Sequence, residues 1–264
     1  MIIDSHAHLD MDKFCSDRDR VIARARDSGV GTIINVGIDL KSSLASIELA
    51  KKYGEIIPAV GFHPHDTAGM TGEDVATLRK LAQDNKVVAI GEIGLDYYRN
   101  LSPREIQLRA FRQQLELAGE LNLPVIIHSR QAQSEVMGIL DTWQKQRRPG
   151  SSAPGVIHCF SGNLPEAQHY IAMGFYLSFT ATITYPNARH TAEIIRGIPR
   201  DRIFVETDCP FLPPQQHRGS RNEPSYVVAT LERVAQVLEI PVATAAQITT
   251  QNVNRLFGCT NIRG

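Results

Sequence analysis

Short apolar runs recur along the whole chain and alternate with longer segments in which apolar residues return every three or four positions. The short runs are rich in β-branched residues, and strands that are buried on both faces of a parallel sheet have this near-continuous apolar pattern. Eight such runs predict strands at Ile2 to Ser5, Gly31 to Val36, Ile56 to Val60, Val87 to Ile90, Val125 to Ile127, Gly155 to Ile157, Phe175 to Phe179 and Arg202 to Glu206.

The segments between these runs have the periodicity of amphipathic helices. They predict helices at Asp17 to Asp27, Lys41 to Lys52, Glu73 to Asp84, Pro103 to Glu120, Gln131 to Gln146, Glu166 to Met173 and Asn187 to Arg196. We expect the outer ring to be completed, and one end of the fold to be covered, by two further helices at Ser225 to Leu238 and Thr244 to Phe257.

Strands that alternate with helices in this way predict parallel strands joined by helical crossovers. Eight such units in 264 residues match a single (β/α)8 TIM-type barrel, an α/β fold of about 250 residues. We therefore expect one domain that covers residues 1 to 264. The proline- and glycine-rich tract from Pro210 to Pro224 follows the last strand, and we interpret it as an active-site loop rather than a linker.

Composition narrows the class of protein. Hydrophobic residues make up 42% and charged residues 21% of the chain, as in an ordinary globular protein. Lys plus Arg equal Asp plus Glu at 28 each, so any contact with nucleic acid must be local. The N-terminus does not read as a secretory signal, and no apolar stretch approaches the roughly 20 residues that span a bilayer. We expect a cytoplasmic protein with reduced cysteines and no membrane contact.

Histidines follow the ends of several predicted strands. His6 and His8 are two residues apart, so in an extended backbone both side chains point to the same face. His128 and His158 each end an apolar run. Taken singly these are weak signals, because each ring could face solvent or donate to a backbone carbonyl in the core.

Two carboxylates occupy similar places in the pattern. Glu92 follows the fourth run and Asp208 follows the last one, where an unpaired buried charge would be costly. In a TIM-type barrel the carboxyl ends of the strands form the face that carries active sites. Imidazoles and carboxylates gathered on that face are typical of a two-metal hydrolase site. We therefore predict metal ligands at the C-terminal face, namely His6, His8, Glu92, His128, His158 and Asp208.

Seven motifs stand in order along the chain. They are DSHAHLD at Asp4 to Asp10, GFHPH at Gly61 to His65, GEIGLDYYR at Gly91 to Arg99, PVIIHSR at Pro124 to Arg130, HCFSG at His158 to Gly162, ETDCPFL at Glu206 to Leu212 and RNEP at Arg221 to Pro224. With these motifs the chain resembles, over nearly its whole length, the TatD family of metal-dependent hydrolases within the amidohydrolase-like barrels.

The resemblance implies a role for each predicted ligand. His6 and His8 would bind one metal ion, and His128 and His158 would bind another. Glu92 would bridge the two ions, and Asp208 would be a further ligand. The cofactors would be two divalent ions, with zinc, manganese or magnesium as candidates, although several imidazoles favour zinc, manganese or iron over a purely magnesium site.

Two such ions lower the pKa of a bridging water and polarise the substrate. We predict three catalytic residues, in which Asp208 acts as general base beside Glu92 and His63 has a supporting or substrate-contacting role. Pro64, next to His63, also suits a purely structural turn. Glu206 could hydrogen-bond a ligand histidine or pair with an arginine, and both interpretations stay open.

Three arginines follow strand ends and are candidate substrate-binding residues, because guanidinium groups bind phosphate well. They are Arg99, Arg130 and Arg221. Each could instead be ordinary surface charge, and Arg221 could form a salt bridge that fixes its loop. Tyr97 and Tyr98 could stack on bases, although aromatic residues in such places more often pack.

The family resemblance implies a deoxyribonuclease that hydrolyses phosphodiester bonds, with 3′-5′ exonuclease-like action on DNA or another phosphoester. The same barrel supports ester, lactone and amide hydrolysis through changes in its loops. A carboxyl-ester or amide hydrolase, such as a D-aminoacyl-tRNA deacylase, is therefore the alternative. A non-catalytic binding protein would leave six ligand-type residues without a use. The oligomeric state is left open.

Overall fold

In the part of the chain that the structure describes, eight parallel strands form two hydrogen-bonded sheets. The computed structural model describes residues 1–147 and 153–259. One sheet has the order β1-β2-β3 and the other β4-β5-β6-β7-β8. The strands are β1 (Ile2–Ala7), β2 (Val30–Val36), β3 (Ile56–Ala59), β4 (Ile90–Asp96), β5 (Val125–Arg130), β6 (Gly155–Ile157), β7 (Tyr176–Phe179) and β8 (Ile203–Val205).

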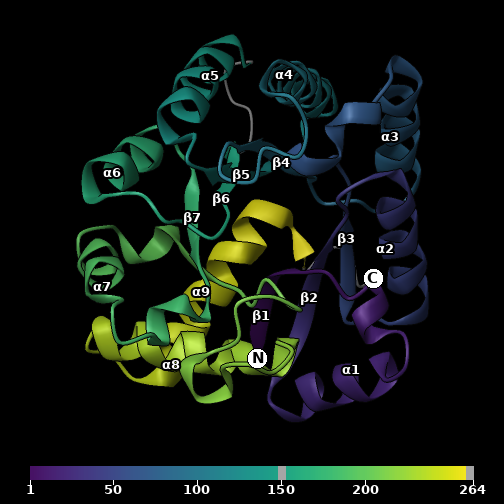
Figure 1. Ribbon diagram of the computed structural model, residues 1–264. Helices are drawn as coiled ribbons and strands as arrows, with labels where there is room; N and C mark the ends of the chain where they lie inside the picture. The colour runs from purple at the N-terminus through teal and green to yellow at the C-terminus, as the bar shows by residue number, and fades with distance from the viewer. Residues whose placement is uncertain (148–152, 260–264) are drawn as a thin grey trace.

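Two seams join these sheets into a barrel, which Figure 1 shows from one end. At one seam an isolated parallel bridge pairs Val60 with Ile90, and at the other Ala7 pairs with Cys209. The predicted (β/α)8 TIM-type barrel is confirmed.

A ring of helices surrounds the strands, and their apolar faces pack against the outside of the barrel. Two of them begin at capping boxes, formed by Thr71 with Asp74 and by Asn163 with Glu166, which satisfy backbone N–H groups at the helix start. The ring consists of α1 (Arg18–Asp27), α2 (Leu40–Lys52), α3 (Gly72–Asp84), α4 (Arg104–Leu121), α5 (Gln133–Gln146), α6 (Leu164–Ala172), α7 (Arg189–Arg196) and α8 (Val227–Val237).

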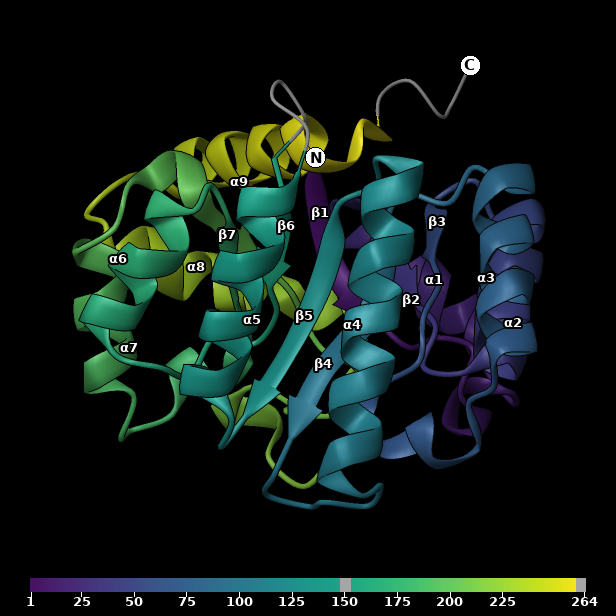
Figure 2. The ribbon, with the colours of Figure 1, turned by 90° about the horizontal axis from the view of Figure 1, so that it is seen from above.

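The ninth helix, α9 (Val242–Phe257), lies across the end of the barrel at which the strands begin (Figure 2). Leu256 and Phe257 of this helix belong to the same buried apolar cluster as Ile3 and Phe204 inside the barrel. Burying such a side chain contributes roughly 1.5–3 kcal/mol. One end of the barrel is thus closed by apolar packing, which leaves the opposite end for polar side chains.

The position of the fourth strand differs from the sequence prediction. The apolar run Val87 to Ile90 predicts a strand that ends where β4 (Ile90–Asp96) begins. Within the run, Val88 donates a backbone hydrogen bond to the third strand, but no regular ladder forms there. The strand itself contains Gly91 and the charged Glu92, which end the apolar run on which the prediction rests. Glu92 therefore lies within a strand instead of behind one.

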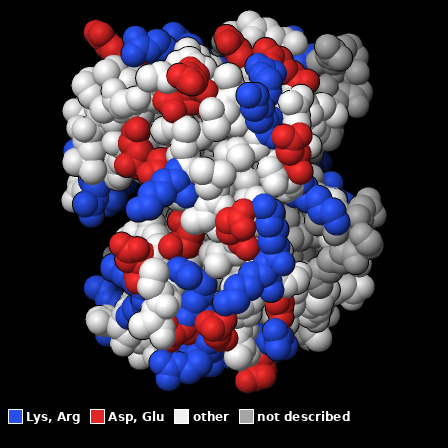
Figure 3. Space-filling view, turned by 90° about the vertical axis from the view of Figure 1, so that its right-hand side faces the viewer, with Lys and Arg blue, Asp and Glu red and all other residues white. Residues whose placement is uncertain are grey.

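The surface carries charges of both signs. On the flank that includes α2 and α3, Lys and Arg side chains are interspersed with Asp and Glu, in agreement with the net charge of zero (Figure 3). Among the helices of the described residues, none is long and apolar enough to cross a membrane.

Candidate metal centre

The six predicted ligands all lie at the carboxyl ends of the strands, on the face opposite α9. The fold thus brings residues from both ends of the chain to one place. His6 lies in β1 and His8 directly follows it, Glu92 lies in β4, His128 lies in β5, His158 directly follows β6, and Asp208 lies three residues after β8.

Glu92 is at the centre of this group, and its two carboxylate oxygens face different sets of side chains. Oε2 lies 3.3 Å from Nε2 of His6 and 3.6 Å from Nε2 of His8. Oδ1 of Asp208 lies 3.5 Å from the same nitrogen of His8. We refer to His6, His8 and Asp208, with Oε2 of Glu92, as the β1 half of the centre.

The other oxygen of Glu92 faces three more imidazoles. Oε1 lies 2.8 Å from Nδ1 of His128, 3.5 Å from Nε2 of His158 and 3.6 Å from Nε2 of His63. We refer to these three histidines, with Oε1, as the β5 half. His63, predicted as a supporting or substrate-contacting residue, therefore lies among possible ligands.

The buried carboxylates set the charge of the centre. Burial alone would raise the pKa of Glu92, but His63, His158 and His6 outweigh it and hold this pKa well below its usual range. Burial alone would lower the pKa of His158, yet Glu206 and Glu92 raise it to about 10. At His63, burial outweighs the effect of Glu92 and holds the pKa well below the usual value. The carboxylates thus favour the protonated form of His158, whereas burial favours the neutral form of His63.

The donor set fits divalent metal ions. In the β1 half, the Nε2 atoms of His6 and His8 lie 3.1 Å apart. This separation is less than twice a zinc–nitrogen distance of about 2.0–2.1 Å, so one ion can contact both rings. Among the described residues, three groups of side chains have ligand atoms close enough together to hold an ion, and two of them match the β1 half and part of the β5 half.

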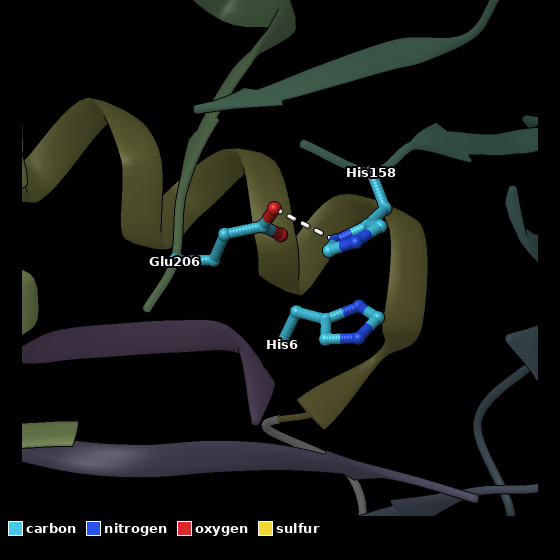
Figure 4. Close-up of side chains that lie close together, drawn as sticks. All are labelled: His6, His158 and Glu206. Atoms are coloured by element: carbon cyan, nitrogen blue, oxygen red, sulfur yellow. Dashed lines mark ion pairs between the residues drawn. The ribbon is translucent and has the colours of Figure 1, made fainter. Parts of the chain in front are cut away.

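The third of these groups contains His6, His158 and Glu206 (Figure 4). The rings of His6 and His158 are stacked with their centroids 3.8 Å apart. Oε1 of Glu206 lies 2.8 Å from Nδ1 of His158 and accepts the backbone N–H of Cys159. Within the described part of the chain, Glu206 therefore pairs with a histidine that is a predicted ligand, and not with an arginine, through the ion-pair contact that Figure 4 marks.

One carboxylate at the centre, that of Asp96, is not among the residues predicted from the sequence. Oδ2 of Asp96 lies 3.1 Å from Nε2 of His128 and 3.0 Å from Nε2 of His65. The sequence contains a signal for this residue. Side chains two or four positions apart in a strand lie on the same face, and Asp96 follows Glu92 by four positions. Gly94 stands between them with a φ of +144°, and a Cβ atom there would clash with the backbone of β5.

The β1 half is supported mainly by backbone contacts. Nδ1 of His8 lies 2.9 Å from the carbonyl oxygen of Val36. The buried carboxylate of Asp4 accepts hydrogen bonds from the backbone N–H and the hydroxyl of Thr207, which precedes Asp208. Asp4 therefore fixes β1 to the loop that carries Asp208.

The three predicted substrate-binding arginines have different surroundings. Arg221 donates two hydrogen bonds of 2.8 Å to the carboxylate of Asp17, so it forms a salt bridge that fixes its loop. The guanidinium of Arg130 lies 4.1 Å from the ring centre of Tyr98, and both side chains are exposed. Arg99 is also exposed. Arg130 and Arg99 are free to meet a substrate, whereas Arg221 is already paired.

Comparison with known proteins gives a consistent picture. The family model described as TatD related DNase matches residues 3–258. The chain is 43% identical over 257 residues to the protein named "Uncharacterized metal-dependent hydrolase YabD" of Bacillus subtilis, covering 97% of this chain and 99% of that one. It is 36% identical over 262 residues to the "3'-5' ssDNA/RNA exonuclease TatD" of Erwinia tasmaniensis, with coverages of 97% and 99%.

Solved structures show the same similarity. The crystal structure of YJJV, a TatD homologue from Escherichia coli, superposes with a TM-score of 0.90 at 30% sequence identity. The superposition covers 97% of this chain and 98% of that one.

Proposed function

The chain belongs to the family of TatD-related DNases, and from this we propose that it is a metal-dependent hydrolase of single-stranded nucleic acid that removes nucleotides from a 3′ end. One relative is named a 3′-5′ exonuclease on single-stranded DNA and RNA. Phosphodiester hydrolysis is therefore favoured over the carboxyl-ester hydrolysis considered as the alternative.

The observation that carries this proposal is the division of the carboxylate of Glu92 between two sets of ligands. One oxygen faces His6 and His8, and the other faces His128 and His158. A carboxylate placed in this way can bridge two divalent ions. We propose His6, His8 and Asp208 as ligands of one ion, and His128 and His158 as ligands of the other.

Divalent ions bound at this centre would supply an activated water and neutralise negative charge on the phosphate. Asp208 faces His8, and its side chain is 14% exposed, so it can take a proton from a water that enters the open end. Nε2 of His63 lies 3.6 Å from Oε1 of Glu92, so His63 is next to the β5 half and is placed to support the centre or to contact the substrate.

Exposed side chains at the open end of the barrel are suited to binding single-stranded nucleic acid. Tyr98 is 57% exposed and lies under the guanidinium of Arg130. An aromatic ring next to a cation can hold an unstacked base and its phosphate. We propose that Arg130 and Arg99 contact the phosphates of the substrate, and that Arg221 acts only through its salt bridge.

Release of nucleotides from 3′-labelled single-stranded DNA by the metal-reconstituted protein tests the proposal. We expect metal-dependent release by the wild type, and a loss of more than about 100-fold in Asp208→Asn and Glu92→Ala, because outer partners of metal ligands alone cost 10–100-fold. Leu44→Ala, an exposed residue on α2, is the matched control. If the wild type is inert on DNA but cleaves aminoacyl esters, the proposed nuclease activity is wrong, whereas the proposed metal centre is still supported.

A further inference from the structure

We propose that Phe211 and Lys13 form a nucleotide subsite next to the β1 half, in which a nucleobase stacks on the ring and its phosphate meets the ammonium group. The subsite rests on the proposed function, since it says where a nucleotide of the substrate is held. It lies apart from Tyr98 and Arg130, which belong to the ends of β4 and β5.

Phe211 is unusual among the apolar residues because it is large, exposed and next to a predicted ligand. It is 43% exposed, and its ring centre lies 6.3 Å from that of His8. An aromatic face left open to water at the rim of a site is a common platform for an unstacked base. A base that stacks here would lie beside the centre at which the phosphodiester is cleaved.

The backbone of Phe211 is held firmly although its side chain is exposed. Its N–H donates to the carbonyl oxygen of Asp208 over 2.9 Å, which closes a tight turn. Its own carbonyl accepts a 2.6 Å hydrogen bond from the side-chain amide of Asn222. Asn222 is fully buried and also donates to the carbonyl of Thr207 over 2.9 Å. The backbone that carries the ring is thereby fixed relative to Asp208.

Lys13 supplies the positive charge of the subsite. It lies in the short 3-10 helix η1 (Asp12–Phe14), and its Nζ is 5.4 Å from the ring centre of Phe211. The guanidinium of Arg221 donates a 2.6 Å hydrogen bond to the carbonyl of Lys13 and covers the buried ring of Phe14 at 4.5 Å. Two neighbouring residues, Arg221 and Asn222, thus hold the two parts of the subsite.

The Phe211 ring is 43% exposed and has an ammonium group over one face, which matches a nucleotide because a flat base can stack on the open part of the ring while its phosphate meets the ammonium group. Every base has a π face, so stacking on Phe211 would tolerate any base sequence. A single strand provides unstacked bases, whereas a duplex does not. The subsite therefore favours single strands without reading their sequence.

Binding to the metal-free protein tests the subsite without hydrolysis. Fluorescence anisotropy is measured in EDTA with a labelled oligothymidylate and with a strand of equal length and charge in which every nucleotide is abasic. We expect the wild type to prefer the strand with bases, and this preference to fall about tenfold in Phe211→Leu and to recover in Phe211→Trp. Lys13→Gln should weaken binding of both strands equally and reduce the salt slope by about one.

The same measurement separates the outcomes. The subsite is wrong if Phe211→Leu keeps the full preference for bases, or if Lys13→Gln leaves the salt slope unchanged. Leu44→Ala is again the control for folding and should bind like the wild type. Loss of the preference in Phe211→Leu, combined with a wild type that cleaves no phosphodiester, would support the subsite and overturn the nuclease.

Discussion

The two halves of the candidate metal centre share Glu92 but are supported in different ways. In the β5 half, each of two histidines has a carboxylate behind it, Asp96 for His128 and Glu206 for His158. In the β1 half, His8 contacts a backbone carbonyl instead. Nδ1 of His6 has no hydrogen-bond partner among the described residues.

This difference bears on how firmly each half would hold an ion. A carboxylate can accept a hydrogen bond from the imidazole nitrogen that does not face the metal. This hydrogen bond fixes the orientation of the ring and makes the metal-facing nitrogen more basic. In the β5 half, Asp96 makes this hydrogen bond to His128, and Glu206 is an ion-pair partner 2.8 Å from Nδ1 of His158, although that nitrogen has no hydrogen-bond partner among the described residues. The ligand Asp208 of the β1 half, in contrast, lies on a loop that is fixed by Asn222 and by surface ion pairs. We expect the β5 half to bind its ion more tightly and the β1 half to exchange its ion more readily.

The largest effect is expected from Glu92→Gln, which removes the charge that both halves share. Metal content should fall in both halves, and hydrolysis should drop by more than about 100-fold. His8→Gln is the matched variant, because it changes the β1 half alone and should leave one ion bound. Metal analysis of dialysed protein checks both. If Glu92→Gln keeps two ions, this carboxylate does not bridge the halves.

The next largest effect is expected from Glu206→Gln, which keeps the shape of the side chain but weakens its interaction with His158. Loss of such a partner costs about 10–100-fold in metal affinity or activity. The loss should be confined to the tighter of two binding phases in a metal titration. A change in the weaker phase alone would reverse the assignment of the two halves.

The sequence predicts much of this arrangement for a simple reason. Apolar strands alternate with amphipathic helices, so the barrel follows, and residues such as His128 mark the carboxyl ends of the strands. Glu206 and Asp96 are harder to assign, because their partners are far away in the chain and only the fold brings them together. The predicted fourth run stops at Ile90, where β4 begins, because Gly91 and Glu92 interrupt the apolar pattern that indicates a strand. Val87 to Ala89 are apolar but lie outside β4.

A smaller effect is expected from Asn222→Ala in the loop of the β1 half. The substitution leaves carbonyl groups of Thr207 and Phe211 without their buried donor, at a cost of about 1–3 kcal/mol in the free energy of unfolding. Urea-induced unfolding measures this cost. Metal binding should weaken in the β1 half and stay unchanged in the β5 half, and the opposite result would contradict the role of Asn222.

The smallest effect concerns pH and the ion pair that fixes the same loop. The hydrogen bond from Arg221 lowers the pKa of Asp17 from 3.8 to about 2. A carboxyl group whose pKa is lowered by folding stabilises the protein above its unfolded pKa, and this contribution disappears as the pH falls towards the folded pKa. The pair is near the surface, so the effect should be at most about 1 kcal/mol.

Asp17→Asn checks this prediction by urea-induced unfolding between pH 2 and pH 6. The wild type should be more stable than the variant by a constant amount above about pH 5, and the difference should shrink steadily as the pH falls from there through 2. A difference that grows towards low pH would have the wrong sign for this ion pair.

The central claim is that Glu92 bridges two ions, and anomalous diffraction from crystals grown with manganese or zinc tests it most directly. The account predicts two anomalous peaks about 3.5–4 Å apart, one next to His6 and His8 and the other next to His128 and His158, with Glu92 between them. A single peak, or two peaks that do not both contact Glu92, would contradict it.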